Sequence, residues 1–142
     1  QAIDTLESLQ MMDTSPNGRI YSDTINIVKG QIGLGVPVYF FFNLNSVELV
    51  DKSQLVNLDE IATIAIQQGY DVTISGAADS ATGTEAINNN LSKRRADYIV
   101  DELVKRGLNK ERLHGYSYGG INKYESNEAN RFTIVTLTSI NH

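Results

Sequence analysis

The segment Gly76–Ala96, GAADSATGTEAINNNLSKRRA, joins the end of a strand pattern to the start of a helical one. Asp79 follows the apolar strand residues, Arg95 lies at the start of the helical pattern, and a polar turn containing Gly83 separates them. A carboxylate accepts hydrogen bonds from an ammonium group, and the flat guanidinium fork binds a carboxylate through two parallel bonds. The pair therefore predicts a site for a small zwitterion, with the chemistry of binding more than of catalysis.

The composition is that of one globular domain. The chain has 142 residues, of which 41% are hydrophobic and 20% are charged. Its net charge of -5 argues against a nucleic-acid partner, since only residues 93–95 form a basic run. No apolar run approaches the ~20 residues that span a bilayer. The absence of cysteine excludes disulfides and thiolate metal sites, and we expect a secretory signal to be absent or already removed.

Residues 1–36 are predicted to form an accessory segment or a linker. Leucine and isoleucine recur at helical spacing within residues 3–9, and the sequence SPNG at residues 15–18 interrupts that pattern. Isoleucines within residues 20–27 are compatible with one or two short strands. The main domain is therefore expected at residues 37–142.

The first strand and helix of that domain are predicted at residues 38–65. Val38–Phe42 is a continuous apolar run, which predicts a central strand or one covered on both faces. Apolar residues then recur at helical spacing over residues 55–65. Asp51 or Ser53 is the expected N-cap of this helix, and Gly69 is the expected C-cap.

A second strand and helix follow. Asp71–Ser75 alternates with period two and predicts a strand that ends at Gly76. The next helix is expected to stop at Gly107. Its predicted core stripe consists of Leu91, Ala96, Ile99, Val100, Leu103 and Val104.

Two strands complete the domain. A third strand carries His114, Tyr116 and Tyr118 on one face and is expected to break at residues 119–120. Phe132–Leu137 changes phase midway, so the fourth strand is predicted to be bulged or buried on both faces. The order strand, helix, strand, helix, strand, strand predicts an α+β fold with two helices packed on one face of a mixed four-stranded sheet.

The spacing of several polar residues resembles that of the OmpA-like C-terminal domains, which bind peptidoglycan in the Gram-negative envelope. The matching elements are Gly76 to Asp79, Gly83, Asn88, Leu91-Ser92-Lys93-Arg94-Arg95-Ala96 and Asn130-Arg131. The resemblance covers roughly residues 37 to 142, and several linked spacings agree.

Three departures from the usual pattern are visible. Ala77-Ala78 replaces a His-Thr pair, and the turn after Asp79 is one residue longer than the commonest form. Both changes resemble the variant found in envelope proteins of Bacteroidetes. Asn43-Leu44-Asn45-Ser46 replaces an FDS-like segment and so removes a charge near the mouth of the site.

The resemblance implies that Asp79 and Arg95 hold the diaminopimelate of the peptidoglycan stem peptide. Residues of the 79–84 turn, including Ser80 and Thr84, are implied to bind the ligand, and Asn88 to line or brace the pocket. Asn130 and Arg131 are implied to support neighbouring loops. The implied role is to anchor an outer-membrane protein at the periplasmic face of the outer membrane, and an upstream membrane-anchoring domain would fit it.

Other interpretations of these residues stay open at this point. Asp79 could be a turn residue that caps the helix, Arg95 an ordinary surface arginine, and residues 88–90 a frayed first turn. A protein-protein interaction domain is the main alternative function. A hydrolase is disfavoured because one acid and one arginine supply no nucleophile with a base. No cofactor or metal is expected, because the two histidines form no cluster and the Ca²⁺-loop spacing is absent.

Overall fold

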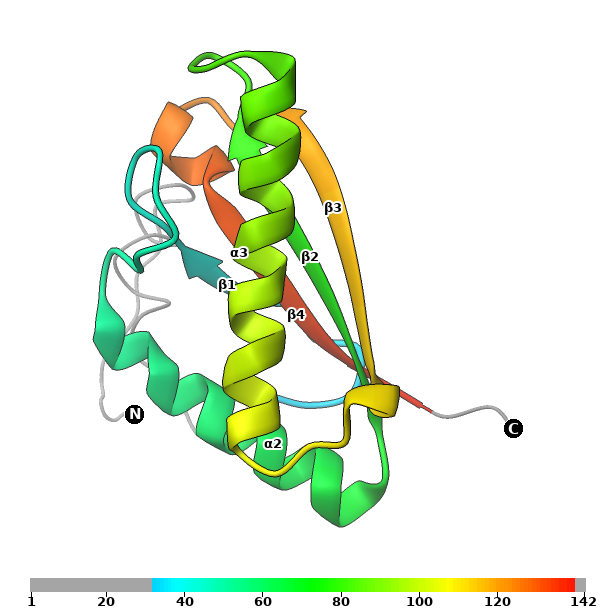
Figure 1. Cartoon of the computed structure of the whole chain (residues 1–142). Coiled ribbons are helices and arrows are strands. Elements are labelled where there is room, and N and C mark those ends of the chain that lie inside the picture. The colour runs from blue at the N-terminus through cyan, green and yellow to red at the C-terminus, as the bar shows by residue number, and fades with distance from the viewer. Residues whose placement is uncertain (1–31, 140–142) are drawn as a thin grey trace, which may run out of the picture.

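A computed structural model of the protein describes residues 32–139. The elements follow the predicted order (Figure 1): β1 (Val38–Phe41), α2 (Leu55–Gln68), β2 (Asp71–Asp79), α3 (Glu85–Lys105), β3 (Leu113–Ile121) and β4 (Phe132–Thr138). Short 3-10 helices lie at Lys52–Gln54, Lys110–Arg112 and Asn127–Asn130. The features expected within residues 1–31 lie outside the described residues, and the domain boundary after residue 36 stays a prediction.

The four strands form one mixed sheet in the order β1-β4-β2-β3. Strand β4 runs antiparallel to both β1 and β2, whereas β2 and β3 are parallel. Both α-helices cover the same face of this sheet (Figure 1). The predicted α+β fold is therefore confirmed. No helix within residues 32–139 has the length and apolar character needed to cross a bilayer.

Strand β1 is covered on both faces, which is one of the two predicted alternatives, and it lies at the edge of the sheet and not at its centre. Phe40 packs in the main core with the helices, and Phe41 packs on the opposite face with Phe132. The central position belongs to β4, whose register with both neighbours is regular. Phe132 and Val135 are both buried although they lie on opposite faces. The change of phase in β4 thus reflects burial on both faces and no bulge.

Strands β2 and β3 are longer than predicted. Both were expected to stop at glycines, but β2 continues through Gly76 to Asp79, and β3 continues to Ile121. A glycine keeps its backbone donor and acceptor, so pairing persists across it. The irregularity is confined to a register shift between Gly76 and Ala78. Asp79 is consequently the last residue of a strand, held by the sheet.

The two α-helices have most of the predicted core, and α2 has its predicted C-cap but not its predicted N-cap. Gly69 ends α2 with a φ of 71°. The Asp51 side chain accepts from the backbone of Ser53 and so caps the 3-10 helix Lys52–Gln54, whereas the N-cap of α2 is Gln54. Most of the α3 stripe is buried, but Val104 is 42% exposed, so that part of the prediction is wrong. The predicted start of α3 is also wrong. Thr84 caps the helix ahead of Glu85, which places the Asn tract and Arg95 inside it.

Helix α3 crosses β2 in backbone contact at Gly76. A Cβ atom on Gly76 would lie 2.1 Å from the carbonyl oxygen of Ser92 and 2.9 Å from the backbone nitrogen of Ala96. No residue with a side chain fits that gap, because both neighbours are backbone atoms of a helix. The absence of a side chain at Gly76 therefore sets the distance between α3 and the sheet.

We predict that Gly76→Ala lowers the free energy of unfolding by about 3 kcal/mol, because the helix must move away from the sheet to admit the methyl group. Urea denaturation followed by circular dichroism measures the change. Gly115→Ala is the matched control, since a Cβ there would meet Val100 at an ordinary 3.8 Å. Equal stability of the two variants would contradict the close packing at Gly76.

Candidate functional site

A cavity of about 250 Å³ lies where β2 ends and α3 begins. Its lining residues come from the loop after β1, the end of β2, the following turn and the first turns of α3. They are Leu44, Asn45, Ala78, Asp79, Thr82, Gly83, Ile87, Asn88, Leu91 and Arg95. Three predicted site residues, Asp79, Asn88 and Arg95, are therefore brought together around one cavity. Ser80 and Thr84 are not among the lining residues.

Arg95 is fully buried, with 0% of its surface exposed, so it is no ordinary surface arginine. Its guanidinium donates to three backbone carbonyls: Nε to Ser46 at 3.0 Å, Nη1 to Ala77 at 2.9 Å and Nη2 to Asn43 at 3.1 Å. Its Cζ also lies 5.4 Å from the centre of the Phe42 ring. The guanidinium thus joins α3 to the end of β2 and to the loop after β1.

The charge of Arg95 persists at neutral pH. Burial lowers the pKa of Arg95 to about 10, and the positive charges of Arg131 and Arg94 act in the same direction, whereas Asp79 opposes them. A pKa of about 10 still leaves the group protonated at pH 7. The cavity therefore has a permanent positive charge in its wall.

Asp79 is 3% exposed, and both of its carboxylate oxygens are bonded. Oδ2 accepts from Nε of Arg131 at 2.6 Å, and Oδ1 accepts from the Thr82 hydroxyl at 2.9 Å. Among the described residues, the ion pair of Asp79 is with Arg131 and not with Arg95. Since Thr84 caps α3, Asp79 is not the helix cap either.

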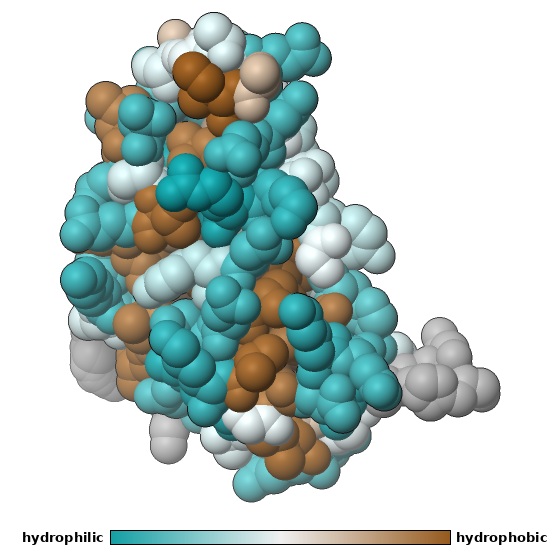
Figure 2. Space-filling model, viewed as in Figure 1, coloured by the Kyte–Doolittle hydropathy of each residue, from teal (hydrophilic) through white to brown (hydrophobic). Residues whose placement is uncertain are grey.

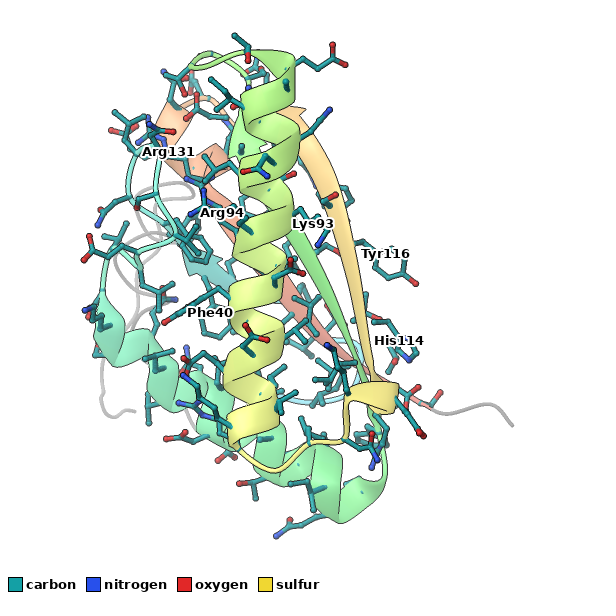
Figure 3. The ribbon with its side chains drawn as sticks, viewed as in Figure 1. Phe40, Lys93, Arg94, His114, Tyr116 and Arg131 are labelled. Carbon is teal, nitrogen blue, oxygen red and sulfur yellow. The ribbon has the colours of Figure 1, made fainter. Side chains whose placement is uncertain are left out.

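Asn130 and Arg131, which the sequence analysis treated together, have different partners in the structure. Asn130 supports a loop as expected, because its side chain bonds to the backbone of Lys123, Tyr124 and Ser126. Arg131 donates to Asp79 through its side chain, and its backbone carbonyl accepts from Phe42 at the start of the loop after β1. Arg131 opens β4, whose antiparallel pairing places its start beside the end of β2. In Figure 3 Arg131 lies at this end of the molecule, near the loop after β1.

The turn residues have defined structural roles. Asn88 is buried and donates from Nδ2 to the carbonyl of Thr82 at 3.0 Å, which braces the turn, and its contact with a ligand stays a prediction. The Thr84 hydroxyl accepts from the backbone of Ile87, and the backbone N–H of Ser80 donates to the carbonyl of Ile121. Ligand contacts by Ser80 and Thr84 stay predictions.

The chemistry of this arrangement suits binding of a zwitterion with a surplus negative charge. Arg95 and Arg131 contribute two guanidinium groups, and Asp79 contributes one carboxylate. Within residues 32–139 no group of three or more histidine or acidic residues could hold a metal ion. His114 lies at the other end of β3, where it bonds to Asp71 at 2.8 Å.

Comparison with known sequences agrees with this architecture. Residues 41–132 match the sequence profile of the OmpA family. Outer membrane protein 40 of Porphyromonas gingivalis is 33% identical over 97 residues, which are 68% of this chain and 25% of that protein. Outer membrane protein 41 of the same organism is 41% identical over 56 residues, which are 39% of this chain and 14% of that protein. The chain thus spans a quarter or less of these relatives.

Solved structures share the fold at low sequence identity. The peptidoglycan-associated lipoprotein of Burkholderia pseudomallei matches with a TM-score of 0.61 and 20% identity, covering 70% of this chain and 89% of that one. A periplasmic domain of Helicobacter pylori MotB matches with a TM-score of 0.59 and 19% identity, covering 77% and 79% of the two chains. Identity at this level is evidence of a common fold.

We predict that Arg95→Ala lowers the free energy of unfolding by about 3 kcal/mol or more, because it leaves three backbone carbonyls without their charged donor. The free energy of unfolding of Arg95→Lys should lie between those of Arg95→Ala and the parent, since an ammonium cannot reproduce the planar fork of the guanidinium. Urea denaturation gives both values. Arg94→Ala is the control for the exposed neighbour and should change little. Similar losses for Arg94→Ala and Arg95→Ala would contradict the structural role of Arg95.

Proposed function

The chain belongs to the OmpA family, and we propose on that basis that it binds peptidoglycan non-covalently and anchors a longer outer-membrane protein to the cell wall. The names of its relatives support this proposal, because two are outer membrane proteins and one structural neighbour is a peptidoglycan-associated lipoprotein. The expected location is the periplasmic face of the outer membrane. The binding is reversible and involves no catalytic turnover.

The observation that carries the proposal is that Asp79 and Arg95 line the same cavity. Its proposed ligand is the diaminopimelate of the stem peptide, whose side chain ends in an ammonium and a carboxylate. The ammonium donates to Asp79, and the carboxylate accepts from Arg95. Each ligand charge therefore meets an opposite charge of the protein.

Arg95 retains donors for this purpose. A guanidinium has five N–H groups, and the backbone carbonyls of Asn43, Ser46 and Ala77 accept from three of them. The other two N–H groups of Arg95 have no acceptor among the described residues. The three existing bonds hold the group in place before the ligand arrives, which lowers the entropy lost on binding.

Arg131 has a supporting electrostatic role in this proposal. Its ion pair with Asp79 fixes one carboxylate oxygen and leaves lone pairs of both oxygens for the ligand ammonium. Its positive charge also increases the attraction of the site for the carboxylates of a peptide. Arg131 is therefore a positioning residue for Asp79.

One observation favours the alternative of a protein-protein interaction domain. Tyr116 and Tyr118 are 57% and 55% exposed on the edge strand β3. In Figure 3 Tyr116 and His114 project from β3 away from α3. Exposed tyrosines are frequent in interfaces. Neither tyrosine lines the cavity, so variants in the cavity distinguish the two functions.

We predict that the parent chain co-sediments with purified Gram-negative peptidoglycan and that Asp79→Asn and Arg95→Lys bind at least about ten-fold more weakly, because each loses a charge-assisted bond to the ligand. Asp79→Asn keeps the shape of the side chain, and Arg95→Lys keeps the positive charge. A thermal unfolding curve for each variant establishes that it is folded at the assay temperature.

Arg94→Ala is the matched control for this assay, because Arg94 is adjacent in sequence and exposed. It should co-sediment like the parent. Parent-like binding by folded Asp79→Asn and Arg95→Lys would show that the cavity is not the peptidoglycan site.

A further inference from the structure

The mouth of the cavity carries two exposed aliphatic side chains. Leu44 comes from the loop after β1 and is 55% exposed, and Ile87 comes from the first turn of α3 and is 48% exposed. Figure 2 shows apolar side chains among polar ones at the end of the molecule where α3 begins. The buried Leu91 and Ala78 continue this apolar lining inward. The site thus combines charged groups with an apolar wall.

The packing of the domain does not explain why Leu44 and Ile87 lie at this position. Neither belongs to the two core clusters of the described residues, so neither is buried by the fold. Exposing an aliphatic side chain to water forgoes the free energy that burial would give. Two such residues from distant parts of the sequence, meeting at one cavity, therefore mark a surface that a ligand can cover.

Both side chains are presented by a fixed backbone. The carbonyls of Asn43 and Ser46, on either side of Leu44, accept from the guanidinium of Arg95. Ile87 is held by the helix cap, since its N–H donates to Thr84 at 3.2 Å. The residue that binds the ligand carboxylate thus also positions one wall of the cavity.

We propose that Leu44 and Ile87 form an aliphatic clamp that contacts the methylene chain of a ligand held at its charged end by Asp79 and Arg95. This inference rests on the proposed function and adds a criterion for the ligand. The charged groups select a zwitterionic end, and the clamp selects a chain long enough to contact both side chains. An amino acid of equal charge and shorter chain binds more weakly because it leaves the two side chains in water.

The test combines protein variants with ligands of different chain length. Isothermal calorimetry measures the binding of free diaminopimelate, and of homologues with the same two amino-acid ends and fewer methylene groups. In the parent each methylene removed should weaken binding by about four-fold, the value for one buried methylene. Leu44→Ala and Ile87→Ala should each bind diaminopimelate about five-fold more weakly and lose most of the dependence on chain length.

Ile66→Ala is the matched control, because Ile66 is also an isoleucine on a helix, is 49% exposed and does not line the cavity. It should reproduce the parent in both measurements. Alanine favours helices, so neither isoleucine variant should disturb its helix. If the parent binds and both clamp variants match Ile66→Ala, the clamp is wrong while the proposed function stands. If the parent binds no diaminopimelate, both proposals are wrong.

Discussion

The buried guanidinium of Arg95 is the contact on which the architecture of the site depends. It bonds to three carbonyls from two segments that are far apart in sequence, Asn43 and Ser46 in the loop after β1 and Ala77 near the end of β2. Burying a charge is costly unless it is hydrogen-bonded. Here three carbonyls and the Phe42 ring replace part of the lost water. The same bonds shape the cavity and hold a positive charge inside it.

The close approach of α3 to the sheet makes these bonds feasible. Because Gly76 has no side chain, the helix backbone at Ser92 and Ala96 lies against β2. A longer distance between α3 and β2 would move Arg95 away from the carbonyl of Ala77, which is adjacent to Gly76. The fold and the site are thus coupled, and a change at Gly76 is expected to affect ligand binding as well as stability.

Much of the fold follows from local patterns, and the resemblance to the OmpA family was correct, including its Bacteroidetes-type variant. The C-cap at Gly69 and most of the buried stripe of α3 were visible in the sequence because each depends on neighbouring residues. The length of β2 was not visible in the sequence, since pairing across Gly76 depends on a partner strand. The helical Asn tract was missed because tertiary contacts, such as that of Asn88 with Thr82, outweigh low helix propensity.

Two charged residues that line the cavity, Asp79 and Arg95, were singled out from the sequence, but the ion pair that Asp79 makes was not predicted. Asp79 and Arg95 were predicted to hold a ligand together because they share one motif, and the ion pair of Asp79 with Arg131 was not foreseen. That contact requires β4 to lie beside β2, which local spacing does not reveal. Likewise, the role of the loop after β1 as acceptor for Arg95 depends on backbone carbonyls, which carry no sequence signal.

The central claim is that the cavity lined by Asp79 and Arg95 binds both the ammonium and the carboxylate of an amino-acid side chain. A nuclear magnetic resonance titration of the isotopically labelled protein, with diaminopimelate and in parallel with lysine, tests it most directly. We expect saturable shifts of the Arg95 Nε–H and the Asn88 side-chain amide with diaminopimelate, and a much weaker response to lysine, which lacks the second carboxylate. Equal responses to the two compounds, or shifts centred on Tyr116 and Tyr118, would contradict the account.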